Sequence, residues 1–176
     1  MITFSRIQSE YNPFYSAAFA LYEESFPTYE QRLQQSRQQI LSHPQYHCCA
    51  ALENGSFCGI LFYWEIGEII YIEHFAVSSN RRGKGIGSQV LKTFLEEHPL
   101  TVLEIDPPCD CISVRRKGFY ERLGFAENRY EHFHPPYRPG VSPHPLQVMS
   151  FPRTISEQEY EMFFTYLKDT VMDKAY

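Results

Sequence analysis

The sequence has no excess of positive charge, because its 16 lysines and arginines are outnumbered by 21 aspartates and glutamates, for a net charge of -5. Such a chain has no general attraction for nucleic acid or for an anionic membrane surface, so we expect neither as a partner. It also lacks an apolar run of the roughly 18 residues that a membrane span needs. Any anion-binding site must therefore be local.

Signs of secretion and of metal binding are also missing. The sequence has no charged start followed by an apolar core and a cleavage site, and its five cysteines are odd in number, so we expect a reduced, cytoplasmic protein. Cys109 and Cys111 are too closely spaced for a usual pair of zinc ligands, and His132, His134 and His144 lie among prolines. We therefore expect no metal.

Hydrophobic periodicity predicts both helices and strands, which indicates a mixed α/β fold. The pair Asn54-Gly55 predicts a hairpin within 46–64, and the nearly continuous apolar run at 69–77 predicts a strand buried on both faces. The other strands are expected at 2–7, at 100–106, from Phe125 and at 146–151. The helices are expected at 11–26, 28–41, 86–98 and 112–123 and from Ser156. Thr28 and Gln31 form a possible capping box at the start of the second of these helices.

The order strand–helix–strand predicts that the strands at 69–77 and 100–106 are parallel neighbours. The length suits a single domain over 1–176. We expect a core of about 1–130 and a proline- and aromatic-rich extension over 131–176 that ends in a helix.

The segment between the strand at 69–77 and the next helix is rich in glycine and in positive charge. It contains Gly83, Gly85, Gly87, Arg81, Arg82 and Lys84. Glycine lets a ligand approach the backbone, and free amides at the start of a helix attract anions, so this segment predicts a diphosphate site with the cations at its rim. The spacing fits neither the P-loop nor the dinucleotide-binding pattern, which disfavours nucleoside triphosphates and NAD.

The stretch RGKGIG at 82–87, directly after HFAV at 74–77, resembles the acyl-CoA-binding motif of the GNAT superfamily of N-acetyltransferases, Arg/Gln-x-x-Gly-x-Gly/Ala. The expected order of elements up to about residue 130 is also similar to that family. The resemblance implies a GNAT-like fold: a central, mostly antiparallel sheet with a splayed parallel strand pair, flanked by helices. It also implies acetyl-CoA as co-substrate.

In this family the amides of the glycine segment hold the pyrophosphate of coenzyme A, and the preceding strand pairs with the pantetheine arm. An amide of that strand would polarise the thioester carbonyl, as a donor in an oxyanion hole does. The cofactor-binding residues implied in this way are Phe75, Ala76, Val77, Arg82, Gly83, Lys84, Gly85, Ile86, Gly87 and Ser88.

A second match to the family covers 113–125. Tyr120 falls at the position of the family's general acid, where a phenol in contact with the departing thiolate would protonate it, so it also counts as a cofactor contact. Ser113 stands where the family usually has asparagine, and Arg116 where alanine is usual. We expect Ser113 to donate a hydrogen bond to the pantetheine arm.

A base is also needed, because an alkylammonium must lose a proton before it attacks. Glu73 and His74 precede the thioester site, and strand alternation sends their side chains to opposite faces, so only one of them can face the acceptor. We favour Glu73. The alternative is that Glu73 pairs with a basic neighbour. Glu104 and Asp106 are lesser candidates for the acceptor pocket.

Two further groups of residues are expected near the acceptor. The carboxylates of Glu23, Glu24 and Glu30 lie by the first two helices, where they either attract a cationic amine or form a solvated face. The aromatic loop at 130–138 lines either the acceptor pocket or a subunit contact.

These residues predict an N-acetyltransferase that transfers an acetyl group from acetyl-CoA to a primary amine by direct attack in a ternary complex. The acceptor is a small molecule or a protein amine. The alternative, left open by Ser113 and Arg116, is a non-catalytic acyl-CoA-binding or protein-interaction domain on the same scaffold. The aromatic-rich C-terminal third also suggests a homodimer.

Overall fold

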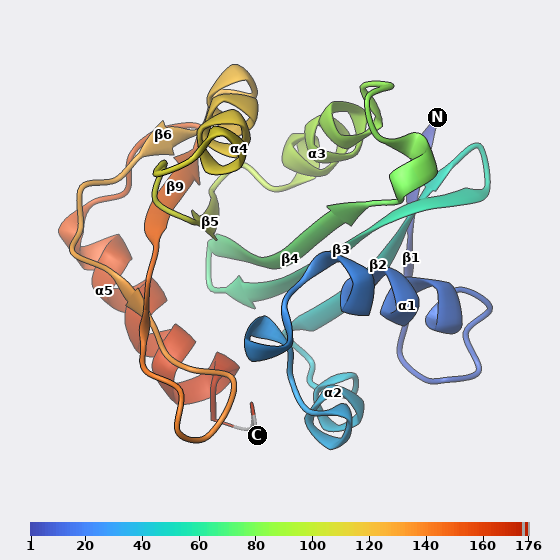
Figure 1. The fold of residues 1–176 in the computed structure, drawn as a ribbon, viewed down its shortest axis with the longest axis horizontal. Coiled ribbons are helices and arrows are strands. Elements are labelled where there is room, and N and C mark those ends of the chain that lie inside the picture. Colours follow the sequence, from blue (N-terminus) through green and yellow to red (C-terminus); the bar gives the residue numbers. More distant parts are fainter. Residues whose placement is uncertain (174, 176) are drawn as a thin grey trace.

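The computed structural model describes residues 1–173 and 175, and it is built on a seven-stranded sheet (Figure 1). The strand order is β1-β2-β3-β4-β5-β9-β6; β4 and β5 are parallel, and the other neighbours are antiparallel. The predicted mixed α/β fold is confirmed. The strands are β1 (Ile2–Arg6), β2 (Tyr46–Glu53), β3 (Ser56–Ile66), β4 (Ile69–Val77), β5 (Thr101–Ile105), β6 (Ala126–Glu127) and β9 (Gln147–Phe151).

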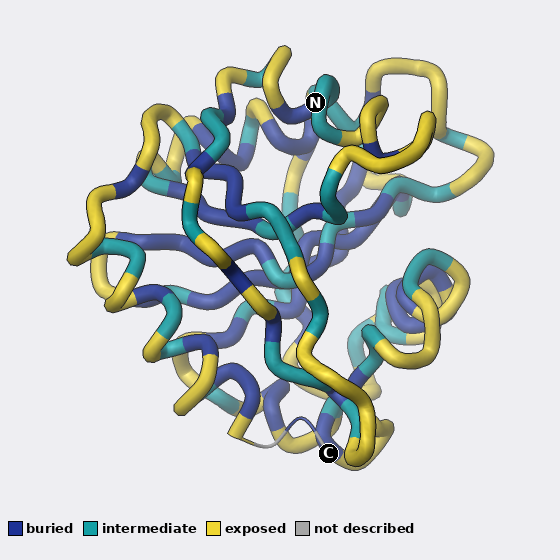
Figure 2. The backbone as a smooth tube through the Cα atoms, turned by 60° about the vertical axis from the view of Figure 1, so that its left-hand side comes forward, coloured by how far each residue is buried: buried dark blue, intermediate teal, exposed yellow. Residues whose placement is uncertain are grey.

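Helices cover both faces of this sheet. On one face pack α1 (Tyr15–Ser25), α2 (Gln34–Ile40) and α5 (Glu157–Tyr166), which continues as a π-helical turn, Leu167–Val171. On the other face pack α3 (Ile86–Glu97) and α4 (Cys111–Arg122). Figure 2 shows the buried strands in the middle, enclosed by helices whose outer turns are exposed. In the described part of the chain, no helix has the length and apolar character to cross a membrane.

Two predicted features of the sheet are confirmed. Asn54 and Gly55 join β2 to β3 with φ angles of 50° and 78°, as a type I′ turn requires. The strand expected at 146–151 is present as β9, and it lies in the sheet between β5 and β6. Val148 and Met149 of β9 are fully buried, one in each core layer. The C-terminal segment therefore contributes to the core.

The loop between α1 and α2 differs from the prediction. Thr28 is expected to cap the second helix, but Thr28–Glu30 forms a short 3-10 turn, and α2 starts later, after Leu33, which has no side-chain cap among the described residues. The side chain of Gln31 donates a hydrogen bond to the carbonyl oxygen of Phe26 at the end of α1 (2.6 Å). This contact occupies the side chain that the capping box needs, so the predicted cap is wrong.

The strands β4 and β5 pair along only part of their length. Their register joins Ile70 to Thr101, Tyr71 to Val102 and Ile72 to Leu103, in that order. Beyond Ile72 the two strands diverge, and β5 continues its pairing with β9 on its other side. We call this divergence the β4–β5 fork. A two-stranded ribbon, β7 (Phe133–His134) with β8 (His144–Pro145), also comes from the C-terminal segment.

Candidate functional site

A cavity of about 780 Å³ lies at the β4–β5 fork. Its walls come from the ends of β4 and β5, from α4, from the α1–α2 loop, and from the loop that joins β7 to β8. Phe75, Ala76 and Val77 line it from β4, Arg82 from the turn that follows, and Tyr120 from α4. The structure therefore brings these predicted site residues together around one hollow.

The glycine turn between β4 and α3 has an open backbone. Gly83 and Gly85 have φ angles of 75° and 76°, which glycine adopts without strain, and a Cβ built on either would meet no described atom within 4 Å. Gly85 is the N-cap residue of α3, and no side chain caps this helix in the described structure. Because the first amides of a helix lack intrahelical acceptors, Ile86, Gly87 and Ser88 present N–H groups to an anion.

The cations of this turn have different partners. Arg82 donates from Nε to the carbonyl oxygen of Val77 (2.9 Å), and Lys84 donates from Nζ to a carbonyl of the preceding turn (3.1 Å). Both side chains are exposed beside the glycines. Arg81 instead pairs with Glu53 at the end of β2 (2.9 Å). Arg81 therefore already faces a carboxylate, whereas the described partners of Arg82 and Lys84 are backbone carbonyls, and the role of all three at an anion site stays a prediction.

Tyr120 lies on α4 and contacts the rings of Phe119 and Phe125, at centroid distances of 5.2 and 5.5 Å. Burial raises the pKa of its phenol to about 12, against a smaller opposing effect of Arg116. The hydroxyl therefore keeps its proton throughout the physiological pH range. This state suits a group that donates a proton to a leaving thiolate.

Ser113 and Arg116 have partners that the sequence did not indicate. The hydroxyl of Ser113 accepts the backbone N–H of Asp110 (3.0 Å) and completes the capping box at the start of α4. Arg116 lines the cavity and forms an ion pair with Asp106, just beyond β5. The contact of Ser113 with a pantetheine arm stays a prediction, and the cap by itself accounts for a serine here.

Glu73 lies at the centre of a buried hydrogen-bond network, with no exposed side-chain surface. Its Oε1 accepts from Nε and Nη2 of Arg32 (3.1 and 2.8 Å) and from the hydroxyl of Tyr137 (2.9 Å), and its Oε2 accepts from the indole of Trp64 (2.7 Å). Burial alone would raise the pKa of Glu73, but Arg32, His74 and these hydrogen bonds outweigh it and lower the pKa. The contacts favour the alternative in which Glu73 pairs with a basic neighbour, and its role as the base stays a prediction.

A bulge in β4 determines how Glu73 and His74 point. Phe62 of β3 pairs with His74 and Tyr63 pairs with Ile72, which leaves Glu73 as the extra residue. The imidazole of His74 then lies 3.9 Å from the carboxylate of Glu73, on the same face of the sheet. The expectation that alternation sends the two side chains to opposite faces is wrong, because a bulge interrupts the alternation. Burial lowers the pKa of His74 to about 4.

Glu104 of β5 is buried between the sheet and the C-terminal segment. Its Oε2 accepts from the hydroxyl of Tyr71 (2.5 Å), its Oε1 is hydrogen-bonded to Nε2 of His132, and Nε2 of His134 lies 3.7 Å from Oε2. Burial alone would raise the pKa of Glu104, but the two histidines and the tyrosine outweigh it and lower the pKa. Glu104 is therefore a buried anion at neutral pH.

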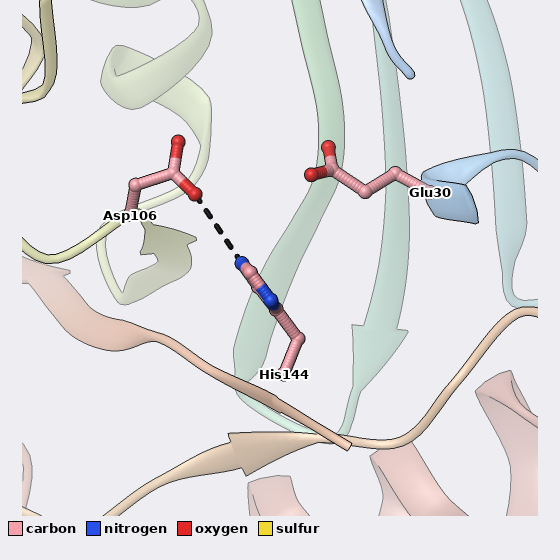
Figure 3. A group of neighbouring side chains, drawn as sticks. All are labelled: Glu30, Asp106 and His144. Carbon is pink, nitrogen blue, oxygen red and sulfur yellow. Dashed lines mark hydrogen bonds and ion pairs between the residues drawn. The ribbon is translucent and has the colours of Figure 1, made fainter. Parts of the chain in front are cut away.

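Glu30, Asp106 and His144 form a second group in the cavity wall. Figure 3 shows their side chains converging from the α1–α2 loop, the end of β5 and β8. Their donor atoms all lie within 4.8 Å of one another, and Nε2 of His144 is 3.4 Å from Asp106. Burial and the charge of Asp106 raise the pKa of Glu30. This arrangement carries negative charge into the cavity, part of which Arg116 neutralises through its pair with Asp106.

The β7–β8 ribbon contributes site residues that the sequence pattern did not identify. His134 and His144 are directly opposite each other in the ribbon, and each faces a carboxylate from β5 or its end. His132 and His134 both contact Glu104 because residues two apart in an extended segment share a face. That His-x-His spacing is the signal from which the sequence could have predicted the pair.

Comparison with known proteins places this geometry in context. The model of the Acetyltransferase (GNAT) family matches residues 5–125. The structure is similar to a protein of Bacteroides thetaiotaomicron described as an acetyltransferase of the GNAT family, with a TM-score of 0.91, 27% identity, and coverage of 97% of this chain and 98% of that one.

Two further structures share the fold at lower identity. One is the ribosomal-protein-S18-alanine N-acetyltransferase of Escherichia coli, with a TM-score of 0.60, 17% identity, and coverage of 90% of this chain and 97% of that one. The other is a GNAT family acetyltransferase of Elizabethkingia anophelis with acetyl-CoA bound, with a TM-score of 0.56, 16% identity, and coverage of 85% and 96%.

Proposed function

The chain belongs to the GNAT acetyltransferase family, and from this premise we propose that it is an N-acetyltransferase that moves an acetyl group from acetyl-CoA to a small primary amine. The observation that carries the proposal is the cavity at the β4–β5 fork. It extends from Val77 and Arg82, beside the glycine turn, to the acidic side chains of Glu30 and Asp106. Both ends of an acetyl transfer reaction, an anionic donor and a cationic acceptor, are thus provided for.

The glycine turn fits coenzyme A. The first amides of α3 would hold the pyrophosphate, and the missing side chains at Gly83 and Gly85 leave room for it. Because β4 stops pairing with β5 after Ile72, the backbone at 75–77 has no strand partner on that side and would pair there with the pantetheine arm, for which Arg82 would release the carbonyl oxygen of Val77. Acetyl-CoA supplies the activated acetyl thioester, and the remaining chemistry belongs to this chain's residues.

The acceptor end suits a small cationic amine. Glu30 and Asp106 supply negative charge there. Arg138 donates from Nε to the carbonyl oxygen of Thr28 (3.3 Å), which joins the C-terminal segment to the α1–α2 loop. A protein substrate would need an open groove between these two loops, so we favour a small molecule over a protein amine.

Two predicted residues keep distinct roles in this proposal. Tyr120 holds a proton for the leaving thiolate; its phenol is a weaker acid than a thiol by about 3 pKa units, so transfer requires direct contact. Glu73 positions Tyr137 and Arg32 at the acceptor end through its hydrogen bonds. The Glu73→Gln experiment described in the Discussion separates this role from that of a base.

The test is a turnover assay with acetyl-CoA and a panel of acceptors: diamines, amino sugars, amino acids and short peptides with free N-termini. Release of coenzyme A is followed by chromatography, because the exposed thiols of Cys109 and Cys111 would react with a thiol dye. We expect turnover with small cationic amines, and kcat/KM at least about 10-fold lower with peptides or with amines that carry a carboxylate.

Two other outcomes would replace the proposal. Turnover with peptides alone would identify a protein acetyltransferase. Binding of coenzyme A, measured by calorimetry, without turnover on any amine would identify the non-catalytic acyl-CoA-binding domain that Ser113 and Arg116 left open.

A further inference from the structure

His134 has one ring nitrogen fixed and the other free. Its Nδ1 lies 2.5 Å from the carbonyl oxygen of Pro135, and a carbonyl can only accept, so Nδ1 carries the hydrogen. Its Nε2 is buried and has no hydrogen-bond partner among the described residues. In the neutral ring this nitrogen presents a lone pair, and the side chain is only 6% exposed in the wall of the cavity.

The free nitrogen lies beside a carboxylate. Oε2 of Glu104 is 3.7 Å from Nε2 of His134, beyond hydrogen-bond distance. A lone pair facing an anion at this separation is unfavourable, and the contact becomes favourable when Nε2 takes up a proton and the ring pairs with the carboxylate. The ammonium group of an acceptor amine can deliver that proton to Nε2 while it donates a second hydrogen to Glu104.

The protein holds the His134 ring rigidly. The ring stacks on that of Tyr137, with centroids 4.9 Å apart and 20° between the planes, and Tyr137 is itself hydrogen-bonded to Glu73. The backbone of His134 pairs with that of His144 in the ribbon, and a following proline restricts it to extended conformations. The ionisable neighbours of the ring are Glu104 on β5, His74 on β4, and His144 and Tyr137 on its own segment.

We propose that His134 is the base of this enzyme: it takes the proton from the acceptor's ammonium group while Glu104 holds that group in place. The proposal rests on the proposed acetyltransferase function. An N–H bond of the ammonium breaks and its proton moves to Nε2. The freed lone pair forms a C–N bond to the thioester carbon, and the C–S bond breaks with its electrons on sulfur. Tyr120 protonates the thiolate, and the amine's second proton restores the phenol of Tyr120. The imidazolium, paired with Glu104, then releases its proton to water.

The other candidate bases fit less well. Glu73 has its oxygens occupied by Arg32, Tyr137 and Trp64. His74 also has a buried nitrogen without a partner among the described residues, but burial lowers its pKa to about 4, too low for effective proton removal near neutral pH.

The test compares His134→Asn with the wild-type enzyme, because an asparagine amide keeps a donor near the position of Nδ1 but has no basic nitrogen. His47→Asn is the matched control: His47 also faces a glutamate (Glu65, 3.0 Å) and also stacks on a tyrosine (Tyr63, 4.5 Å), but it lies on β2, away from the cavity. We expect His134→Asn to lower kcat/KM by at least about 100-fold and to abolish the ascending limb of its pH profile, with His47→Asn unchanged.

A second measurement separates a base from a residue that only shapes the pocket. A fluorinated alkylamine whose pKa lies below the assay pH is already neutral and needs no base to attack. With that acceptor we expect His134→Asn and wild type to differ by less than about 5-fold. Should His134→Asn fold poorly, by circular dichroism and coenzyme A binding, then His134→Gln and the wild-type pH profile are used.

Three results would overturn the assignment. They are an unchanged pH profile in an active, folded His134 variant, an equal loss with both classes of amine, and a wild-type profile without an ascending limb. If the wild-type protein turns over no amine at all, it is the proposed acetyltransferase function that fails.

Discussion

Replacing Glu73 by glutamine removes one charge from a buried pair and turns one of its two accepting oxygens into an amide donor. The side chains of Arg32 and Glu73 are 2% and 0% exposed, and their charged atoms lie 2.8 Å apart. Nη1 of Arg32 has no hydrogen-bond partner among the described residues, so the guanidinium depends on Glu73 and on the carbonyl of Val171 (2.6 Å). In Glu73→Gln this cation stays buried without a counter-charge.

The expected cost follows from that geometry. Breaking a buried ion pair by neutralising one partner destabilises a protein by about 3–5 kcal/mol. For a domain of this size each kcal/mol lowers the melting temperature by about 2–4 °C, so we expect a drop of roughly 6–20 °C. Urea unfolding followed by circular dichroism measures the same loss as a free energy.

The control is the variant Arg32→Met and its combination with Glu73→Gln. If the two residues form a structural pair, the double variant loses less stability than the sum of the single ones, since it no longer buries an isolated charge. The reasoning is refuted if Glu73→Gln unfolds within about 1 kcal/mol of wild type yet loses activity by 100-fold or more. That combination would make Glu73 the base, as the sequence suggests.

Three further predictions concern separate parts of the molecule. Gly85→Ala and its control Gly55→Ala both introduce a side chain at positive φ in open space, so each should lose about 1–2 kcal/mol of stability. Only Gly85→Ala should also weaken coenzyme A binding, by about 10-fold or more in calorimetry. Equal affinities of the two variants would show that the glycine turn is not part of the binding site. The pKa of His74 is about 4 in the folded protein against an ordinary 6.5, so its contribution to stability is complete above pH 6.5, and about 3 kcal/mol is lost as the pH falls to 4. In His74→Phe the melting temperature should therefore depend less on pH between 6.5 and 4. The same pH dependence as in wild type would contradict this prediction. Of the five thiols, the exposed Cys109 and Cys111 should react with a disulfide reagent at once and the three buried ones only in denaturant, and more than two fast thiols would disagree with the fold.

The C-terminal segment shows where prediction from sequence ended. Its last helix was recognisable because Ser156 and Glu159 form a capping box three residues apart, and the structure confirms both hydrogen bonds. The ribbon before it was not recognisable, because two-residue strands have no measurable alternation and five prolines lie between or within them. Yet this ribbon brings His134 and His144 to the carboxylates of β5.

The bulge at Glu73 limited prediction in a similar way. A strand with one extra residue has the same composition as a regular one, so alternation placed Glu73 and His74 on opposite faces. The bulge becomes visible only in the register with β3, where His74 rather than Glu73 lies opposite Phe62. The partner of Glu73 was equally hidden, because Arg32 is 41 positions away in the chain.

By itself, the sequence determined the proposed donor side of this protein: a glycine turn at 82–87 that follows a buried strand, and a helix start with unpaired amides. It also determined membership of the GNAT family, which the comparisons confirm. These features depend on the conformational freedom of consecutive residues, so adjacent letters suffice to specify them. Only the tertiary structure decided the proposed acceptor side. There the charge and orientation of each group depend on burial and on partners from β4, β5, the α1–α2 loop and the β7–β8 ribbon, which meet only when the chain has folded.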